Sequence, residues 1–209
     1  MKEEGTIESK MRSKIMEWGR GRIFFLEDFD ELEDPVSVRQ FICSMVSEGF
    51  VIRLARGIYC YPRLSAPEYG PATIIKPDSE TIAQALAARE NVRITPYGDQ
   101  AAYKLGLTTM YISSQKYLTD GSPRVIHLAA DRKIYFNHTS EVKMFAFQNE
   151  NMQMLSSTLR AMGNDYFDNP ERRRKVHEIL RAVPDKEFNN DIKIPPAWVG
   201  KILQDIWNN

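Results

Sequence analysis

The sequence predicts an α+β protein with two domains, and three observations support this prediction. Residues 36–48 carry a helical apolar stripe, and two short strands around a basic turn follow at residues 50–62. The order helix, strand, helix, helix, strand, strand is complete within residues 6–62. A proline-rich stretch then precedes a region of mixed strands and helices. The pattern is typical of an N-terminal winged helix-turn-helix followed by a mixed α/β domain with a small sheet and C-terminal helices.

The first elements are justified by spacing and by their end signals. Residues 6–18 form an expected helix, because Ile7, Met11, Ile15 and Trp18 recur every three or four positions before two glycines. Residues 22–26 (RIFFL) fit a short strand, and the acidic residues 26–32 fit a brief second helix that ends before Pro35.

The helix expected at residues 36–48 has two different faces. Its apolar stripe follows the i, i+3, i+4, i+7, i+8 pattern, with Val38, Phe41, Ile42, Met45 and Val46. Pro35 lies just outside the expected start and Gly49 fits a left-handed C-terminal cap. The opposite face is polar and carries little negative charge, with Ser37, Arg39, Gln40, Ser44 and Ser47.

The strands that follow this helix flank a basic turn, Ala55-Arg56-Gly57. A polar helix beside a basic ribbon is suited to the major groove and to the flanking phosphates, so DNA binding is the leading hypothesis. We expect the helix to enter the groove while the hairpin holds phosphates or reaches a minor groove. The candidate contacts are Ser37, Arg39, Gln40, Ser44, Arg53 and Arg56. Gln40 can pair with adenine, and Arg39 with guanine or a phosphate.

The expected domain boundaries follow from composition. Residues 1–63 form the DNA-binding domain, residues 64–77 a linker with an extended stretch at 72–76, and residues 78–209 the second domain. The second domain is expected to begin with a helix at 78–88, a strand at 92–95 and a helix at 99–105. Three strands then follow, at 115–119, 124–129 and 133–137. Three helices come last, at 149–162, 170–182 and 195–207. Asp120-Gly121 and Ala130-Asp131 are the expected turns that join the three strands.

Charge and cysteine usage limit the function classes. The chain of 209 residues has 28 basic and 28 acidic residues, so its net charge of zero argues against a strongly electrostatic nucleic-acid binder. The charge is segregated, however, with six acids in residues 27–34 and four arginines against one acid in residues 36–66. Two cysteines, no secretory signal and no long apolar run indicate a reducing cytoplasm and no membrane partner.

Enzyme chemistry has little support in the sequence. His127, His138 and His177 are too far apart for a compact metal motif, and no nucleophile elbow or phosphate-binding glycine motif is present. We therefore expect no catalytic residue, no metal and no cofactor. A nucleic-acid enzyme is favoured only if Asp78, Glu80 and Asp120 converge in a pocket. The basic run at residues 172–175 (RRRK) can contact nucleic acid or an acidic partner, or be a solvated helix face.

Several segments together resemble a known family. The runs RGRIFFLEDF, SVRQFICSMVSEG, FVIRLARGIYCYP, RITPYGDQAAYKLGL and YLTDGSPRVIHL resemble the AbiEi-like antitoxins, the transcriptional regulators of abortive-infection toxin–antitoxin operons. The similarity covers residues 20–153, and the LARGIY and YLTDGSPR stretches are its most specific parts. The resemblance implies a winged helix that represses its own promoter. It also implies a C-terminal antitoxin domain that counteracts a nucleotidyltransferase-type toxin.

The chain departs from that family in charge. The family's DNA-binding domains tend to be basic, whereas residues 1–66 hold ten bases and eleven acids here. Binding that uses few phosphate contacts, or several copies on one operator, would reconcile the two. The alternative hypothesis is a winged-helix interaction module that binds a partner protein rather than DNA, which the acidic residues 27–34 favour.

Overall fold

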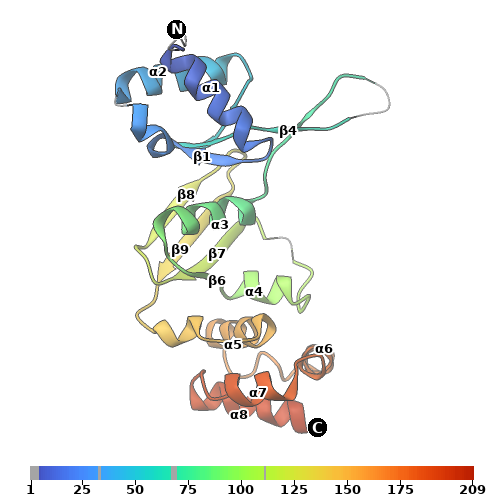
Figure 1. The fold of residues 1–209 in the computed structure, drawn as a ribbon. Helices are drawn as coiled ribbons and strands as arrows, with labels where there is room; N and C mark the ends of the chain where they lie inside the picture. Colours follow the sequence, from blue (N-terminus) through green and yellow to red (C-terminus); the bar gives the residue numbers. More distant parts are fainter. Residues whose placement is uncertain (1–4, 33, 67–69, 111) are drawn as a thin grey trace. The chain divides into compact units, whose positions relative to one another are not determined.

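The computed structural model shows a mixed α+β protein made of two compact units (Figure 1). It describes residues 5–32, 34–66, 70–110 and 112–209. The N-terminal unit comprises Met1–Ala85 with His127–Ala130, and the C-terminal unit comprises Leu86–Ile126 with Asp131–Asn209. The boundary between the two units therefore falls inside a single helix, α3 (Ser79–Glu90).

The N-terminal unit contains the elements that the sequence predicts, in the predicted order. They are α1 (Ile7–Trp18), β1 (Ile23–Phe25), the 3-10 helix η1 (Leu26–Leu32), α2 (Pro35–Ser47), β2 (Ile52–Ala55) and β3 (Ile58–Cys60). The three strands form an antiparallel sheet in the order β1-β3-β2. Side chains cap both α-helices, because Thr6 Oγ1 accepts a hydrogen bond from the amide of Ser9 and Asp34 accepts one from the amide of Ser37.

The core of the N-terminal unit is aromatic. The ring of Phe24 lies 5.6 Å from that of Trp18, 5.9 Å from that of Phe29 and 5.9 Å from that of Tyr59. The apolar stripe of α2 packs into the same cluster, with Val38, Ile42 and Met45 buried as expected. Burial of each large apolar side chain stabilises the fold by about 1.5–3 kcal/mol. Helix α2 is therefore held by one face, and its polar face is directed away from the core.

The segment expected to be a linker contains a small pair of strands. β4 (Arg63–Leu64) pairs antiparallel with β5 (Ile74–Ile75), which lies within the extended stretch predicted at residues 72–76. The amide of Ser65 donates to the carbonyl of Thr73 at 2.9 Å, and their hydroxyls lie 2.7 Å apart. Periodicity cannot predict this pairing, because each strand has only two residues.

The C-terminal unit begins with a four-stranded sheet in the order β6-β7-β9-β8. Its strands and early helices are β6 (Ile94–Pro96), α4 (Asp99–Lys104), β7 (Ser114–Thr119), β8 (Arg124–His127) and β9 (Lys133–His138). β7 pairs antiparallel with β6 and parallel with β9. The chain bends at Asp120-Gly121 between β7 and β8 as expected, but a hairpin of these two strands is wrong, because β9 lies between them in the sheet.

The physical reason for that error is the role of Asp120. Its carboxylate accepts one hydrogen bond from the amide of Arg93 and another from Arg93 Nε, each at 2.8 Å. These bonds, led by the side-chain bond from Arg93, hold the pKa of Asp120 below its usual value. The residue thus ties the end of β7 to the start of β6. The turn expected at Ala130-Asp131 is present, and both residues have positive φ, as a tight hairpin turn requires.

Helices complete the C-terminal unit. They are α5 (Glu150–Met162), α6 (Pro170–Arg181), α7 (Asp185–Asp191) and α8 (Ala197–Asn208), after the short 3-10 helix η2 (Val142–Phe145). The sequence predicts α5, α6 and α8, but η2 and α7 are missing from the prediction. Phe188 of α7 is buried and stacks on Trp207 of α8 with ring centroids 4.1 Å apart. Within the described residues, no helix has both the length and the apolar character that crossing a bilayer requires.

Candidate nucleic-acid interface

The polar face of α2 is accessible along its length. Arg39, Gln40 and Ser44 are exposed, as is Cys43 on the same face. Val36, at the start of the helix, is 63% exposed. Because the opposite side of α2 is buried, this exposure follows from the amphipathic spacing of the sequence.

Two of the six predicted contact residues are already hydrogen-bonded to carboxylates. The hydroxyl of Ser37 donates to Asp34 Oδ2 at 2.6 Å, and the hydroxyl of Ser44 donates to Glu48 Oε1 at 2.8 Å. The bonds from Ser37 lower the pKa of Asp34. The side-chain bond from Arg12, followed by that from Ser44, lowers the pKa of Glu48, so both carboxyls are charged near neutral pH. A hydroxyl beside a carboxylate is a poor phosphate contact, which leaves Arg39 and Gln40 as the stronger candidates on this helix.

The β2–β3 hairpin presents the other two candidates. Arg53 and Arg56 are exposed, and Gly57 adopts a positive φ of 75° in the turn between the strands. Arg53 Nε donates to the carbonyl of Ala55 at 3.3 Å, which holds the guanidinium along the hairpin. Arg56 has no side-chain partner among the described residues.

Tyr59 lies in β3 and pairs across the sheet with Arg53. Burial raises the pKa of Tyr59, whereas the charge of Arg53 lowers it. The side chain is buried and its ring stacks on that of Phe24 at 5.9 Å. Tyr59 therefore belongs to the core of the N-terminal unit, while Arg53, the residue opposite it, remains exposed.

Sequence reasoning missed two features of this region. Cys43 is not among the predicted contact residues, although its position four residues after Arg39 places it on the polar face. The second feature is a hollow of about 260 Å³ at the start of α2, beside Arg39. Its lining combines apolar side chains with the acids that precede the helix: Leu26, Phe29, Pro35, Val38, Glu27, Asp30 and Asp34.

Two of the three carboxylates proposed for a nucleic-acid enzyme, Asp78 and Asp120, have structural roles. Asp78 accepts a hydrogen bond from the amide of Thr81 at the start of α3, and Asp120 binds Arg93. Nowhere in the part of the chain that the structure describes do three His, Cys, Asp or Glu side chains form a group able to hold a metal ion. His138 Nδ1 lies 2.9 Å from the carbonyl of Gly121, which assigns this histidine a hydrogen bond within its own unit.

Comparison with known proteins places the chain in a family. Residues 10–188 match a family of unknown function, DUF6088, and because this is most of the chain, the protein belongs to that family. No curated protein matches it. It is similar to a solved structure described as the crystal structure of RV2827C protein from Mycobacterium tuberculosis, with 14% identity and a TM-score of 0.52. The alignment covers 98% of this chain and 77% of that chain. At this identity the likeness supports the mixed α+β fold alone.

Proposed function

We propose that the N-terminal unit is a winged helix-turn-helix that binds double-stranded DNA. The order of α1, β1, η1, α2, β2 and β3 supports this assignment, with β1 joining the hairpin to make a three-stranded sheet. In such a fold the exposed helix reads the major groove and the hairpin is the wing. The observation that supports DNA binding most directly is that Arg39 and Gln40 on α2 and Arg53 and Arg56 on the hairpin are all exposed.

Within this proposal the exposed residues have different roles in binding DNA. Gln40 and Arg39 contact base edges, because amide and guanidinium groups pair bidentately with adenine and guanine. Val36 contacts a thymine methyl from the start of the helix, where recognition helices touch bases. Arg53 and Arg56 hold phosphates and fix the orientation of the unit. Ser37 and Ser44 keep α2 in place through Asp34 and Glu48 rather than binding DNA.

We further infer that the protein is the antitoxin of a toxin–antitoxin pair that represses its own operon. This step depends on the resemblance to AbiEi-like antitoxins across residues 20–153, which extends over parts of both units. The C-terminal unit is then the part that counteracts a nucleotidyltransferase-type toxin. A cytoplasmic location and an absence of catalytic activity belong to the same proposal.

The experiment is a salt series of fluorescence anisotropy titrations with a labelled duplex from the operon's own promoter. For the wild type we expect affinity to fall steeply between about 50 and 200 mM salt. Arg56→Ala should weaken binding and lower the magnitude of the log–log salt slope by about 0.9, because one phosphate contact is lost. Arg174→Ala is the matched control, since this arginine of α6 is exposed and its side chain is 73% accessible. Equal slopes for wild type and Arg56→Ala would remove the hairpin from the DNA interface.

A second candidate function is favoured by the acidic hollow at the start of α2. Carboxylates around an apolar floor suit a basic side chain of a protein partner, not a phosphate. In that case the N-terminal unit binds a protein, and the purified product of the neighbouring gene is the first partner to test. Pull-down by the wild type that is lost on Asp30→Lys, with no promoter binding in the titrations above, would favour this candidate over DNA.

A further inference from the structure

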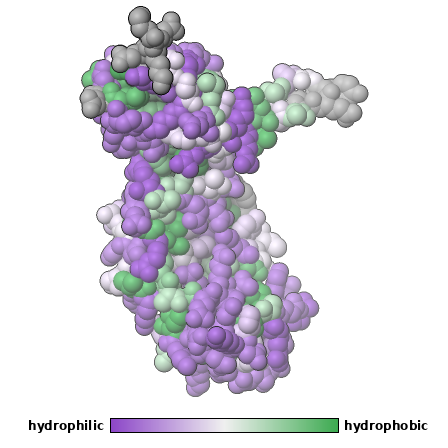
Figure 2. All heavy atoms as spheres, in the orientation of Figure 1, coloured by the Kyte–Doolittle hydropathy of each residue, from purple (hydrophilic) through white to green (hydrophobic). Residues whose placement is uncertain are grey.

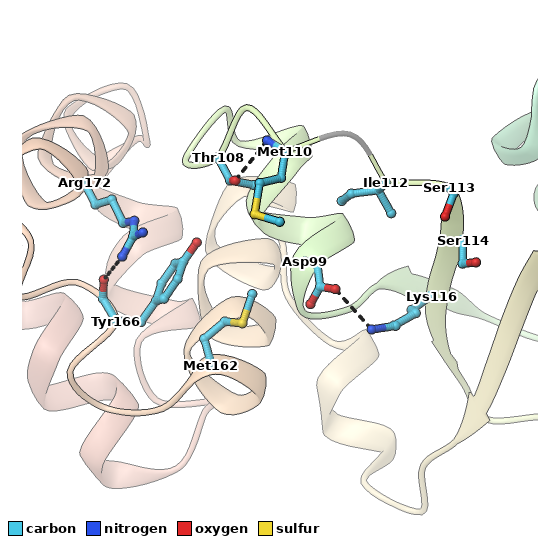
Figure 3. A pocket seen from close by; sticks show the side chains of 10 residues that line it. All are labelled: Asp99, Thr108, Met110, Ile112, Ser113, Ser114, Lys116, Met162, Tyr166 and Arg172. Carbon is cyan, nitrogen blue, oxygen red and sulfur yellow. Dashed lines mark hydrogen bonds and ion pairs between the residues drawn. The ribbon is translucent and has the colours of Figure 1, made fainter.

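The C-terminal unit contains a half-open cavity of about 470 Å³, within the range of small-molecule sites (Figure 3). Its walls come from α4, the segment after α4, the start of β7, the end of α5 and the start of α6. A second hollow of about 340 Å³ adjoins it, and Thr108 and Arg172 line both. Neither cavity includes a residue of the N-terminal unit.

The middle of the larger cavity is apolar and adaptable. Met110, Ile112 and Met162 face it, and the ring of Tyr166 stands beside Met162 (Figure 3). Met110 is 75% exposed, so its side chain is accessible to a ligand. Methionines and an aromatic ring together suit a flat, polarizable group such as a nucleobase.

The basic run of α6 is divided between surface ion pairs and these cavities. Arg173 pairs with Asp205, and Arg174 pairs with Glu178 at 3.5 Å. Arg172 and Lys175, by contrast, line the hollows and have no acidic partner among the described residues. A solvated helix face therefore accounts for Arg173 and Arg174, but it does not explain the positions of Arg172 and Lys175.

Arg172 is oriented before any ligand arrives. Its guanidinium lies 4.3 Å from the centre of the Tyr166 ring, and one terminal nitrogen donates to the Tyr166 carbonyl at 3.3 Å. The remaining N–H groups of the fork stay available, and such a fork matches a phosphate in two places. A fixed guanidinium beside an aromatic ring loses little side-chain entropy on binding.

Lys175 reaches the second hollow because Gly106 lacks a side chain. A Cβ on Gly106 would lie 2.9 Å from Lys175 Nζ, and Gly106 also has a positive φ of 64°. Thr108 and Thr109 add hydroxyl groups to the same hollow, and Glu171 is its one acid. The first amides of α6 are already bonded to Asn169, so the two cations and the threonines supply the anion contacts.

The far end of the larger cavity carries a paired donor and acceptor. Lys116 Nζ donates to Asp99 Oδ2 at 3.1 Å, and both side chains are partly exposed (Figure 3). Such a pair offers an acceptor and a donor to the polar edge of a flat ring. From one end to the other, the two hollows thus present a hydrogen-bonding end, an apolar middle and a cationic end.

We propose that these two hollows form one binding site for a nucleoside phosphate. The base lies between Met110 and Met162 with its polar edge at Asp99 and Lys116. The phosphate lies at Arg172, Lys175 and the hydroxyls of Thr108 and Thr109. A free nucleotide and the phosphorylated end of a nucleic-acid strand share this chemistry, so the test includes both sources.

The test is isothermal titration calorimetry of the full-length protein, without promoter DNA, against AMP, ATP, inorganic phosphate and a short 5′-phosphorylated oligonucleotide. We expect saturable binding of AMP or ATP. Arg172→Ala should weaken binding by about tenfold or more, because a charge-assisted bond to phosphate is lost. Tyr166→Ala should weaken it by about fivefold or more, because Arg172 loses the ring that orients its guanidinium. Arg174→Ala is the matched control on the same helix and should bind like the wild type.

Each outcome decides the proposal. Tighter binding of the oligonucleotide with the same variant pattern would support the site and identify a strand end as the source. Absence of saturable binding by all nucleotides would overturn it. An equal loss of affinity in Arg174→Ala would also overturn the proposal, because it would indicate only general charge attraction. Binding of inorganic phosphate as tightly as AMP would overturn it as well. Arg172→Lys keeps the charge and the packing, so an intermediate affinity for this variant guards against a loss caused by misfolding.

Discussion

Helices α2 and α5 each contain 13 residues, yet they place their hydroxyl side chains in opposite surroundings. Ser44 and Ser47 of α2 are exposed, whereas Ser156 and Ser157 of α5 are fully buried. The hydroxyl of Ser157 donates to the carbonyl of Pro96 at 2.8 Å, which satisfies it inside the core. The difference lies in what covers each helix. α5 packs against α4, β6, α6, α7 and α8, while α2 packs against α1 and η1.

The comparison teaches that polar residues indicate a binding face only where no second layer covers them. Both helices pair apolar and polar residues at helical spacing, so sequence periodicity alone does not separate them. Figure 2 shows the result at the surface, where hydrophilic side chains dominate and hydrophobic ones form separate patches. The open face of α2 is thus a property of its peripheral position.

The largest expected effect concerns the covered helix. Leu155→Ala in α5 should lower the free energy of unfolding by about 2–5 kcal/mol, because the side chain is fully buried and leaves a cavity. Ser47→Ala on α2 should change it by less than about 0.5 kcal/mol. Urea denaturation followed by circular dichroism measures both. Similar losses in the two variants would contradict the contrast between a central and a peripheral helix.

A substitution that disturbs the start of α5 should lower the free energy of unfolding almost as much. The buried carboxylate of Asp191 accepts hydrogen bonds from the amides of Gln148 and Asn149 at 2.9 and 2.8 Å. Asp191→Ala leaves both amides without this acceptor and should destabilise the protein by about 2–3 kcal/mol. Asn190→Ala, one residue earlier and exposed, is the control in the same denaturation experiment. An unchanged midpoint for Asp191→Ala would show that water replaces the carboxylate at no cost.

On the exposed helix the expected effect is on binding instead of stability. Gln40→Ala should weaken binding to the promoter by about five- to a hundredfold, the range for one bidentate base contact. Binding to a scrambled duplex and the unfolding midpoint should both stay the same, because the side chain is exposed and outside the core. If the two duplexes lose affinity equally, Gln40 does not read sequence.

The smallest expected effect uses the two cysteines as native probes. Cys43 is exposed on α2, whereas Cys60 is buried in β3, where burial raises the pKa of its thiol to about 11. A thiol reagent at about pH 8 should therefore modify Cys43 rapidly and Cys60 only on unfolding, since the thiolate is the reactive form. Promoter DNA should slow the labelling of Cys43. Labelling at the same rate with and without DNA would place this face of α2 outside the interface.

Sequence reasoning works well for the N-terminal unit because its elements are local. Helices α1 and α2 each have their own side-chain cap and apolar stripe, and β2 and β3 are joined by the turn at Gly57. The polar face of α2 follows from the same spacing. The partners of Ser37 and Ser44 could also be found, because Asp34 and Glu48 are three and four residues away along the helix. The DNA contacts and the antitoxin role stay predictions.

The C-terminal unit is harder to predict because its pairings are long-range. β7 pairs in parallel with β9, two strands away, so adjacency in sequence misleads. Helix α7 has only seven residues, too few for a periodic pattern, and it is fixed by Phe188 packing on Trp207. The proposed nucleotide site cannot be predicted from the sequence for the same reason, since Thr108 and Arg172 come together only after folding.

Helix α3 determines how the protein can be cut for experiments. Its buried stripe continues through the boundary between the units, with Ile82 and Ala83 on one side and Leu86 and Ala87 on the other. A truncation inside this helix would separate those pairs and leave an incomplete helix with exposed apolar side chains, which promote aggregation. Neither unit is therefore a safe fragment without all of Ser79–Glu90. Loss of function in a shorter piece would say more about that damaged end than about DNA or nucleotides.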